Sequence, residues 1–132
     1  MTDNLITLKK ITDTRGSLVV LEEGRDIPFA IKRCYFIYDT KSDQPRGLHA
    51  HKALQQIFFC VRGSCDIRLD DGNNKETIRM DTPATAVYVG PMIWHEMHNF
   101  SADCVFFALA SAAYDESDYI RDYKEFIARA AA

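Results

Sequence analysis

The segment QIFFCVRGSCDIRL (residues 56–69) contains two short apolar runs that meet at a glycine turn. Gln56–Arg62 and Cys65–Leu69 are rich in residues that favour strands. Between them, Arg62-Gly63-Ser64 can supply the positive φ angle that a tight connection needs. The segment therefore predicts a β-hairpin, and Asp70-Asp71-Gly72-Asn73-Asn74 predicts a second turn directly after it.

Similar runs recur along the chain, which is typical of an all-β sandwich or barrel. We expect strands at Leu18–Leu21, Ile31–Tyr38, Gln56–Arg62, Cys65–Leu69, Thr77–Met80, Ala86–Val89, Ile93–Asn99 and Cys104–Ala110. Only the C-terminal segment has apolar residues spaced by three and four, namely Tyr119, Ile120, Tyr123, Phe126 and Ile127. That spacing predicts one amphipathic helix from about Glu116 to Ala130, with Asp115 or Ser117 as its N-cap.

Composition limits the classes of function. The chain has 132 residues, 47% of them hydrophobic, which is enough for a single domain over residues 1–132. Its net charge of −3 offers no basic surface on average, so we expect no nucleic-acid partner. No apolar run is long enough to span a membrane and the N-terminus is unlike a signal peptide, so we expect a cytoplasmic protein without a membrane partner. The 4 cysteines form no C-x-x-C pair, and we interpret them as structural.

All 4 histidines fall in two short segments, GLHAH (47–51) and WHEMHN (94–99). Because alternate residues of a strand point to the same face, His49 and His51 are expected side by side. By the same rule His95 shares a face with Met97, whereas His98 shares the other face with Glu96. At most one histidine of the second segment is therefore expected to join the first pair.

Two chemistries fit such a group. A His-x-His pair with a carboxylate and a later histidine, here His95, is a familiar ligand set for a divalent ion. In this chain the carboxylate is missing, because the residues after the pair are Lys52-Ala53-Leu54-Gln55-Gln56. Proton transfer meets no such objection, since a neutral imidazole accepts and returns a proton near neutral pH. We therefore expect general acid–base chemistry with no metal and no other cofactor.

The same residues resemble a known pattern. Gly47–His51, followed by Gln55-Gln56 and Val61-Arg62-Gly63, is similar to the first motif of the cupin superfamily with its metal-binding glutamate replaced by glutamine. Gly90–His95, followed by Asn99, is similar to a degraded second motif. The resemblance implies a cupin-type β-barrel, or jelly roll, with one C-terminal amphipathic helix.

A narrower resemblance covers almost the whole chain, from about Leu5 to Phe126. IKRCYFIYD (31–39), PRGLHAHK (45–52) and Gln55-Gln56 resemble the sugar 3,4-ketoisomerases, the FdtA-type group of WxcM-like cupins. This resemblance implies a metal-free isomerase that moves the keto group of dTDP-4-keto-6-deoxyglucose from C4 to C3 through an enediol. Enzymes of this group serve deoxysugar biosynthesis for glycans such as O-antigen lipopolysaccharide and S-layers.

The resemblance also implies roles for single residues. His49 is the base, His51 holds the neighbouring oxygen or shares the proton, and Tyr35 donates a hydrogen bond to the enediolate. A guanidinium group suits the pyrophosphate, because its planar fork matches phosphate oxygens. The residues expected to bind substrate are Arg33, Arg46, Lys52, Arg15 and His95.

Arg15 and His95 are also the expected determinants of configuration at C4. Their combination resembles the members that give the galacto product. The resemblance further implies a homodimer that exchanges N-terminal strands, for which Leu5–Leu8 is a suitable segment.

Three other functions stay open. A 3,5-epimerase of the same substrates would also use a histidine base and a tyrosine acid, but with an aspartate supporting the histidine, and the sequence shows no matching arrangement. A non-catalytic nucleotide-sugar-binding cupin would bind substrate without deuterium uptake. A metal-dependent cupin oxygenase would carry stoichiometric metal.

Overall fold

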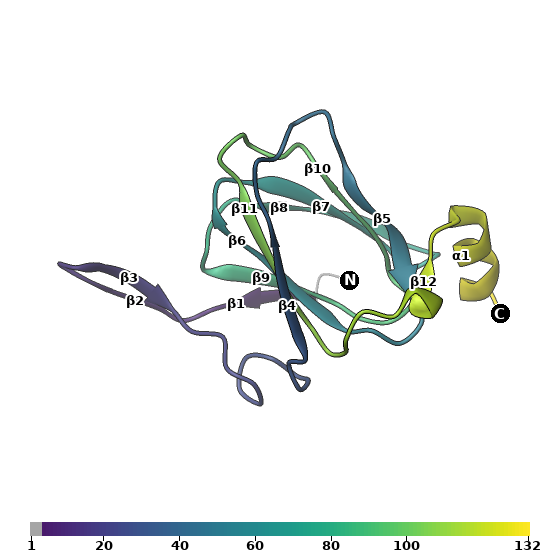
Figure 1. Ribbon diagram of the computed structural model, residues 1–132, viewed down its shortest axis with the longest axis horizontal. Coiled ribbons are helices and arrows are strands. Elements are labelled where there is room, and N and C mark those ends of the chain that lie inside the picture. The colour runs from purple at the N-terminus through teal and green to yellow at the C-terminus, as the bar shows by residue number, and fades with distance from the viewer. Residues whose placement is uncertain (1–3) are drawn as a thin grey trace.

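The computed structural model describes residues 4–132, which form two facing antiparallel sheets and one short C-terminal helix (Figure 1). The first sheet has the strand order β1-β9-β6-β11-β4, and the second has the order β12-β5-β10-β7-β8. The first comprises β1 (Leu5–Thr7), β4 (Arg33–Ile37), β6 (Gln56–Arg62), β9 (Thr85–Val89) and β11 (Val105–Ala110). The second comprises β5 (Arg46–His51), β7 (Cys65–Asp70), β8 (Lys75–Met80), β10 (Trp94–His98) and β12 (Tyr119–Ile120).

The main apolar core lies between the two sheets. Phe58 and Phe106 face it from the first sheet, and Ile67, Leu69 and Met80 face it from the second. These side chains are fully or almost fully buried, and their removal from water stabilises the fold. The all-β, cupin-like fold with one C-terminal helix is therefore confirmed, although the strands stay in two separately hydrogen-bonded sheets.

The predicted hairpins are also confirmed. Gly63 and Ser64 join β6 to β7, and residues 71–74 join β7 to β8. The eight predicted strands all occur, with ends that differ by a few residues. Three further strands were absent from the predicted set. β2 (Lys10–Asp13) and β5 each contain several polar residues or glycine, and the residues of β12 were assigned to the predicted helix.

The predicted bounds of the C-terminal helix are wrong. Glu116–Asp118 form the 3-10 helix η2 instead, and β12 then pairs with β5, so that α1 begins only at Tyr123 and ends at Ala130. The cap of α1 is Asp122, whose carboxylate accepts a hydrogen bond from the Lys124 amide, while Asp115 caps η2. Strand pairing prevails here because it buries Ile120 against Trp94 and Phe126 on the outer face of the second sheet.

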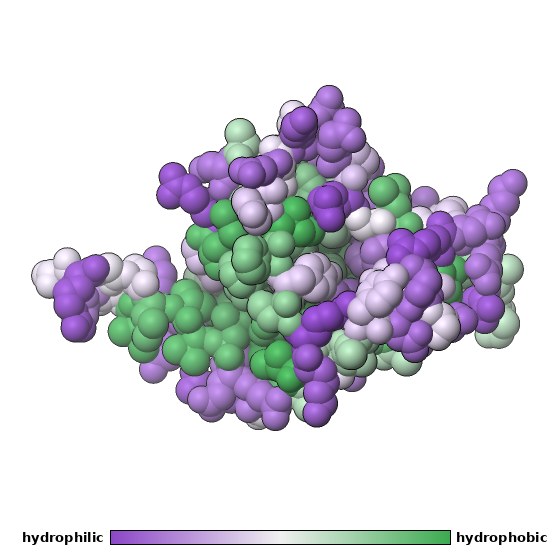
Figure 2. Space-filling model, viewed as in Figure 1, coloured by the Kyte–Doolittle hydropathy of each residue, from purple (hydrophilic) through white to green (hydrophobic). Residues whose placement is uncertain are grey.

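One element lies away from the body. Among residues 4–132, strands β2 and β3 (Gly16–Val19) pair only with each other, and they form a hairpin that projects at the opposite end of the molecule from α1 (Figure 1). Ile11 and Leu18 are exposed on it, and apolar side chains also gather where the hairpin meets the body (Figure 2). No helix within residues 4–132 is long and apolar enough to cross a membrane.

Candidate active site

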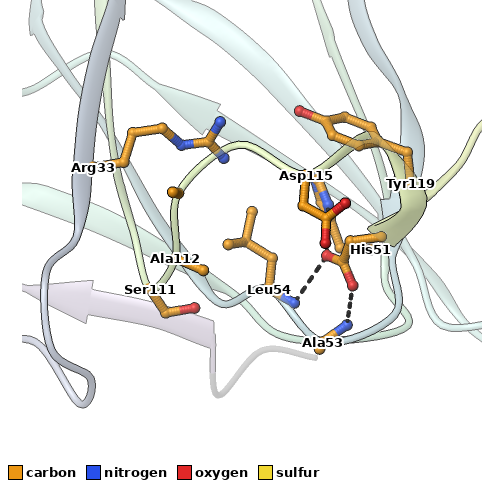
Figure 3. A pocket seen from close by; sticks show the side chains of 10 residues that line it. Arg33, His51, Ala53, Leu54, Ser111, Ala112, Asp115 and Tyr119 are labelled. Atoms are coloured by element: carbon orange, nitrogen blue, oxygen red, sulfur yellow. Dashed lines mark hydrogen bonds and ion pairs between the residues drawn. The ribbon is translucent and has the colours of Figure 1, made fainter.

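Five of the expected site residues line one cavity between the two sheets. Arg33 and Tyr35 reach it from β4, Arg46 and His49 from β5, and His95 from β10. An adjoining pocket, which shares Arg33 and Tyr119 with the first, contains His51. Arg33 lies on one side of this pocket and His51, Asp115 and Tyr119 on the other (Figure 3).

Local backbone geometry in β5 directs the histidines. Gly47 and Leu48 have φ values of 83° and 60°, and the pairing of β5 with β10 shifts register next to His95. A Cβ atom on Gly47 would lie 2.9 Å from the His95 carbonyl oxygen, so only glycine permits this close approach. The irregularity leaves His49 opposite His95, with their ring centroids 4.6 Å apart.

His49 and His95 line this cavity and His51 lines the adjoining pocket, so three of the chain's histidines lie close together. The centroids of His49 and His51 are 5.0 Å apart, and those of His51 and His95 are 5.8 Å apart. The fourth, His98, lies on the other face, where its Nε2 is 2.7 Å from a Glu96 carboxylate oxygen. This confirms the expected arrangement, in which His95 joins the pair and His98 does not.

Hydrogen bonds fix the tautomer of all three rings. Nδ1 lies 2.9 Å from the Gly47 carbonyl oxygen in His49, 3.1 Å from Asp118 Oδ2 in His51, and 3.1 Å from the Ile93 carbonyl oxygen in His95. Carbonyl and carboxylate oxygens only accept, so each neutral ring carries its proton on Nδ1. Each Nε2 atom is then left with a free lone pair.

The three imidazoles are neutral at pH 7. Burial lowers the pKa of His49 to about 4, and the proximity of His51 lowers it further in the same direction. Burial likewise lowers the pKa of His95 to about 3. Burial also lowers the pKa of His51, although the Asp118 carboxylate opposes this shift. All three rings can therefore accept a proton without first losing one.

These pKa values predict acid lability. Between about pH 6.5 and pH 4 the unfolded chain binds protons on histidines that stay neutral in the folded protein. The unfolded state binds more protons in this range, so the free energy of unfolding falls as the pH is lowered. We expect a lower thermal midpoint at pH 5 than at pH 7, and a smaller difference in a His95→Gln variant. Equal midpoints at the two pH values would contradict the neutral, buried state of these rings.

Gln56, one of the two adjacent glutamines that follow the histidine pair, has a buried side chain. Its Oε1 accepts a hydrogen bond of 2.7 Å from the Tyr35 hydroxyl. Burial raises the pKa of Tyr35 well above its ordinary value, so the hydroxyl keeps its proton and remains a donor. Ring nitrogens of the three cavity histidines lie within 4.8 Å of one another, a spacing that three metal ligands would also have. Gln56 presents an amide beside these rings, and its oxygen holds the Tyr35 hydroxyl in place.

Two arginines give the cavity positive charge. Arg33 and Arg46 both line it, and the Arg33 guanidinium lies 5.6 Å from the centre of the Tyr35 ring. Arg33 Nε is buried and has no hydrogen-bond partner among residues 4–132. A buried donor with no partner is costly, and an anionic ligand in the cavity would satisfy it.

Two of the expected binding residues lie elsewhere. The Lys52 ammonium donates to the Ser117 carbonyl oxygen, and the residue lines neither pocket. Arg15 lies at the turn of the projecting β2–β3 hairpin, where its side chain is 88% exposed and bound to Asp13. Within this single chain, Arg15 is thus not part of the cavity.

Two residues of the site were missed from the sequence. Asp118 bonds to His51 from a position 67 residues away, so an aspartate does support a histidine, an arrangement that the sequence did not show. Tyr119 packs on both histidines of β5, with ring centroids 4.8 Å from His49 and 4.3 Å from His51. Both residues lie in the segment that was predicted to be helical. Their contacts with β5 were therefore not predicted.

Comparisons with known proteins agree with this geometry. The family model described as "FdtA: WxcM-like, C-terminal" matches residues 1–131. A curated relative, the TDP-4-oxo-6-deoxy-alpha-D-glucose-3,4-oxoisomerase of Aneurinibacillus thermoaerophilus, is 57% identical over 126 residues, or 96% of this chain and 91% of the relative.

Solved structures give the same result. A 3,4-ketoisomerase from Helicobacter canadensis is 45% identical, with a TM-score of 0.94 over 97% of this chain and 96% of its own. QdtA, a 3,4-ketoisomerase from Thermoanaerobacterium thermosaccharolyticum, was solved as a histidine-to-asparagine variant with TDP-4-keto-6-deoxyglucose; it is 43% identical, with a TM-score of 0.92 over 96% of this chain and 91% of its own. A second QdtA structure carries a tyrosine-to-arginine and an arginine-to-histidine change and contains TDP; it is 45% identical, with a TM-score of 0.93 over the same shares of the two chains.

Proposed function

The chain belongs to the FdtA family and is a sugar 3,4-ketoisomerase, and we propose that it converts TDP-4-keto-6-deoxyglucose into the TDP-linked 3-keto-6-deoxy sugar. The observation that carries this proposal is the group of three neutral imidazoles around one cavity, with Tyr35 beside them. A keto-group shift needs a base that takes one carbon-bound proton and returns one to the neighbouring carbon. It needs no change in the overall oxidation state of the sugar.

In this mechanism the C4 ketone acidifies the proton on C3, and His49 Nε2 removes it. An enediol forms across C3 and C4. O4 takes up a proton as the enediol forms. The protonated base then delivers a proton to C4 while O3 gives its proton to the group that protonated O4, and the keto group is at C3. Tyr35 donates to Gln56 in the structure, and rotation of its hydroxyl would direct the same proton to the enediolate. His51 holds the adjacent oxygen or shares the proton.

Arg33 and Arg46 are the proposed ligands of the diphosphate. Both line the cavity, and the unpartnered Nε of Arg33 provides a donor already removed from water. Lys52 lines neither pocket in this chain, so we do not propose it as a ligand of the diphosphate. A cytoplasmic location for the enzyme fits the four free cysteines, since reduced thiols are usual there.

We propose a homodimer as the working form. Leu5–Thr7 pair with β9 of their own chain, so the segment left for exchange is the β2–β3 hairpin. Its apolar residues Ile11 and Leu18 are exposed. Apolar side chains also gather where the hairpin meets the body (Figure 2). A hairpin docked on a second subunit would bury these residues and carry Arg15 toward that subunit's cavity.

Arg15 and His95 are proposed to set the galacto configuration at C4. The arginine and histidine introduced together into QdtA are the same residue types, and their positions are separated by the same number of residues. We expect a double variant, Arg15→Tyr with His95→Arg, to yield mainly the gluco product. The C4 proton coupling in the NMR spectrum of the product measures the change. An unaltered galacto product would contradict this role.

The test of the proposed function is proton NMR of the purified protein with TDP-4-keto-6-deoxyglucose in D₂O. We expect a 3-keto sugar that carries deuterium at C4. Deuterium at C3 or C5 with the keto group still on C4 would instead indicate an epimerase. Binding without any change in the sugar would indicate a non-catalytic nucleotide-sugar-binding protein.

A further inference from the structure

The carboxylate of Asp118 contacts His51 but has no part in the proposed mechanism. Asp118 lies at the end of η2, and its carboxylate accepts three hydrogen bonds. Oδ1 accepts from the Ala53 amide at 2.9 Å, and Oδ2 accepts from the Leu54 amide at 3.2 Å and lies 3.1 Å from His51 Nδ1. The carboxylate is therefore locked between the end of β5 and the ring of His51.

Burial makes this contact consequential. The His51 side chain is 4% exposed and that of Asp118 is 19% exposed, so little solvent competes for the bond. An ionised carboxylate only accepts hydrogen bonds, which obliges His51 to carry its proton on Nδ1. The lone pair of Nε2 then lies on the opposite side of the ring.

Asp118 also distinguishes His51 from the other histidines of the cavity. The Nδ1 partners of His49 and His95 are backbone carbonyl oxygens, which carry no charge. Among the residues that the structure describes at this cavity, only His51 has a carboxylate partner. A proton that reaches His51 Nε2 creates a cation, and Asp118 provides the balancing negative charge within hydrogen-bond distance.

We infer that Asp118 is a positioning residue for the isomerase reaction, which holds His51 in the Nδ1–H tautomer and stabilises it as the temporary carrier of the proton. This inference rests on the proposed function. It assigns the proton-carrying step to His51 and leaves the abstraction of the C3 proton to His49.

The experiment uses the full chain labelled with ¹⁵N in histidine, because only 4 histidines contribute to the spectrum. Long-range ¹H–¹⁵N spectra of the ligand-free protein at pH 7 report which ring nitrogen carries the proton. In the unsubstituted protein we expect His51 to be protonated on Nδ1. A proton on Nε2 would overturn the inference without any activity measurement.

The decisive variant is Asp118→Asn. With its oxygen in the Oδ1 place, asparagine still accepts from the Ala53 amide, and its NH₂ group takes the Oδ2 place, where it donates to His51 Nδ1 and leaves the Leu54 amide without that acceptor. The ring is then forced into the Nε2–H tautomer and loses the lone pair that faces the cavity. We expect this tautomer change together with a fall in kcat of roughly 100-fold, within the range for loss of acid–base catalysis, and little change in KM. A tautomer change with kcat unaltered would overturn the inference, as would an unchanged tautomer.

Two further variants separate positioning from folding. Asp118→Glu keeps a carboxylate, and we expect it to retain the Nδ1–H tautomer and a kcat clearly above that of Asp118→Asn; equal rates would contradict the inference. Glu96→Gln is the matched control, because Glu96 and His98 form the same kind of pair, 2.7 Å apart, on the outer face of the second sheet. We expect its kcat to be unaltered.

The proposed function and this inference fail differently. The unsubstituted enzyme is assayed beside the variants, and a lack of 3-keto product from it would contradict the proposed function. Turnover by the unsubstituted enzyme and equally by Asp118→Asn would contradict only the inference.

Discussion

Replacing His49 with asparagine is expected to lower turnover of TDP-4-keto-6-deoxyglucose by about 1,000-fold or more, with binding of TDP almost unaltered. The imidazole is the proposed base, and loss of a positioned acid–base group costs about 10²–10⁴ in rate. Asparagine is similar in size but its amide does not titrate near neutral pH. Arg33 and Arg46, the proposed diphosphate ligands, are untouched by the change.

Two quantities are measured for the variant, the rate of turnover and the affinity for TDP. NMR in D₂O follows product formation and exchange at C3, and calorimetry follows TDP binding. His98→Asn is the matched control, because that ring lies on the other face and bonds to Glu96. Near-normal turnover by His49→Asn would refute its assignment as the base, and loss of TDP binding would show that it acts in binding instead.

Gly63→Ala is expected to give the largest loss of stability from a single added methyl group, roughly 2–4 kcal/mol. Gly63 has a φ of 69°, which costs about 1 kcal/mol or more for an alanine. Its Cβ would also clash with Ser101 Oγ and lie 2.7 Å from the Cα of Cys104, which is backbone and cannot move aside freely. Both penalties act at the tight turn between β6 and β7, which border the main core.

Chemical denaturation at pH 7 measures this loss. Gly24→Ala is the control, because Gly24 has a similar φ of 84° but no heavy atom within 4 Å of the added Cβ. It should lose only the conformational part, about 1 kcal/mol. Equal losses in the two variants would show that crowding at Gly63 contributes nothing.

Local pattern was a reliable guide where neighbouring residues decide the structure. The run from Gln56 to Leu69 is apolar enough for strands, and its glycine turn admits only a tight connection. The period of two in a strand correctly placed His49 beside His51 and separated His95 from His98. The same rule did not predict β12. Tyr119 and Ile120 fit the helical spacing of the residues that follow them, but the helix itself begins only at Tyr123.

The sequence by itself therefore determined the all-β fold, the family, and the identity of the histidines that share a face. These properties follow from side-chain periodicity and from motifs of a few adjacent residues. Only the tertiary structure decided that Asp118 bonds to His51 across 67 residues, and that Arg15 lies on a hairpin away from its own cavity. Such contacts depend on how distant strands pair and on which surfaces they bury, and no spacing within one segment encodes that choice.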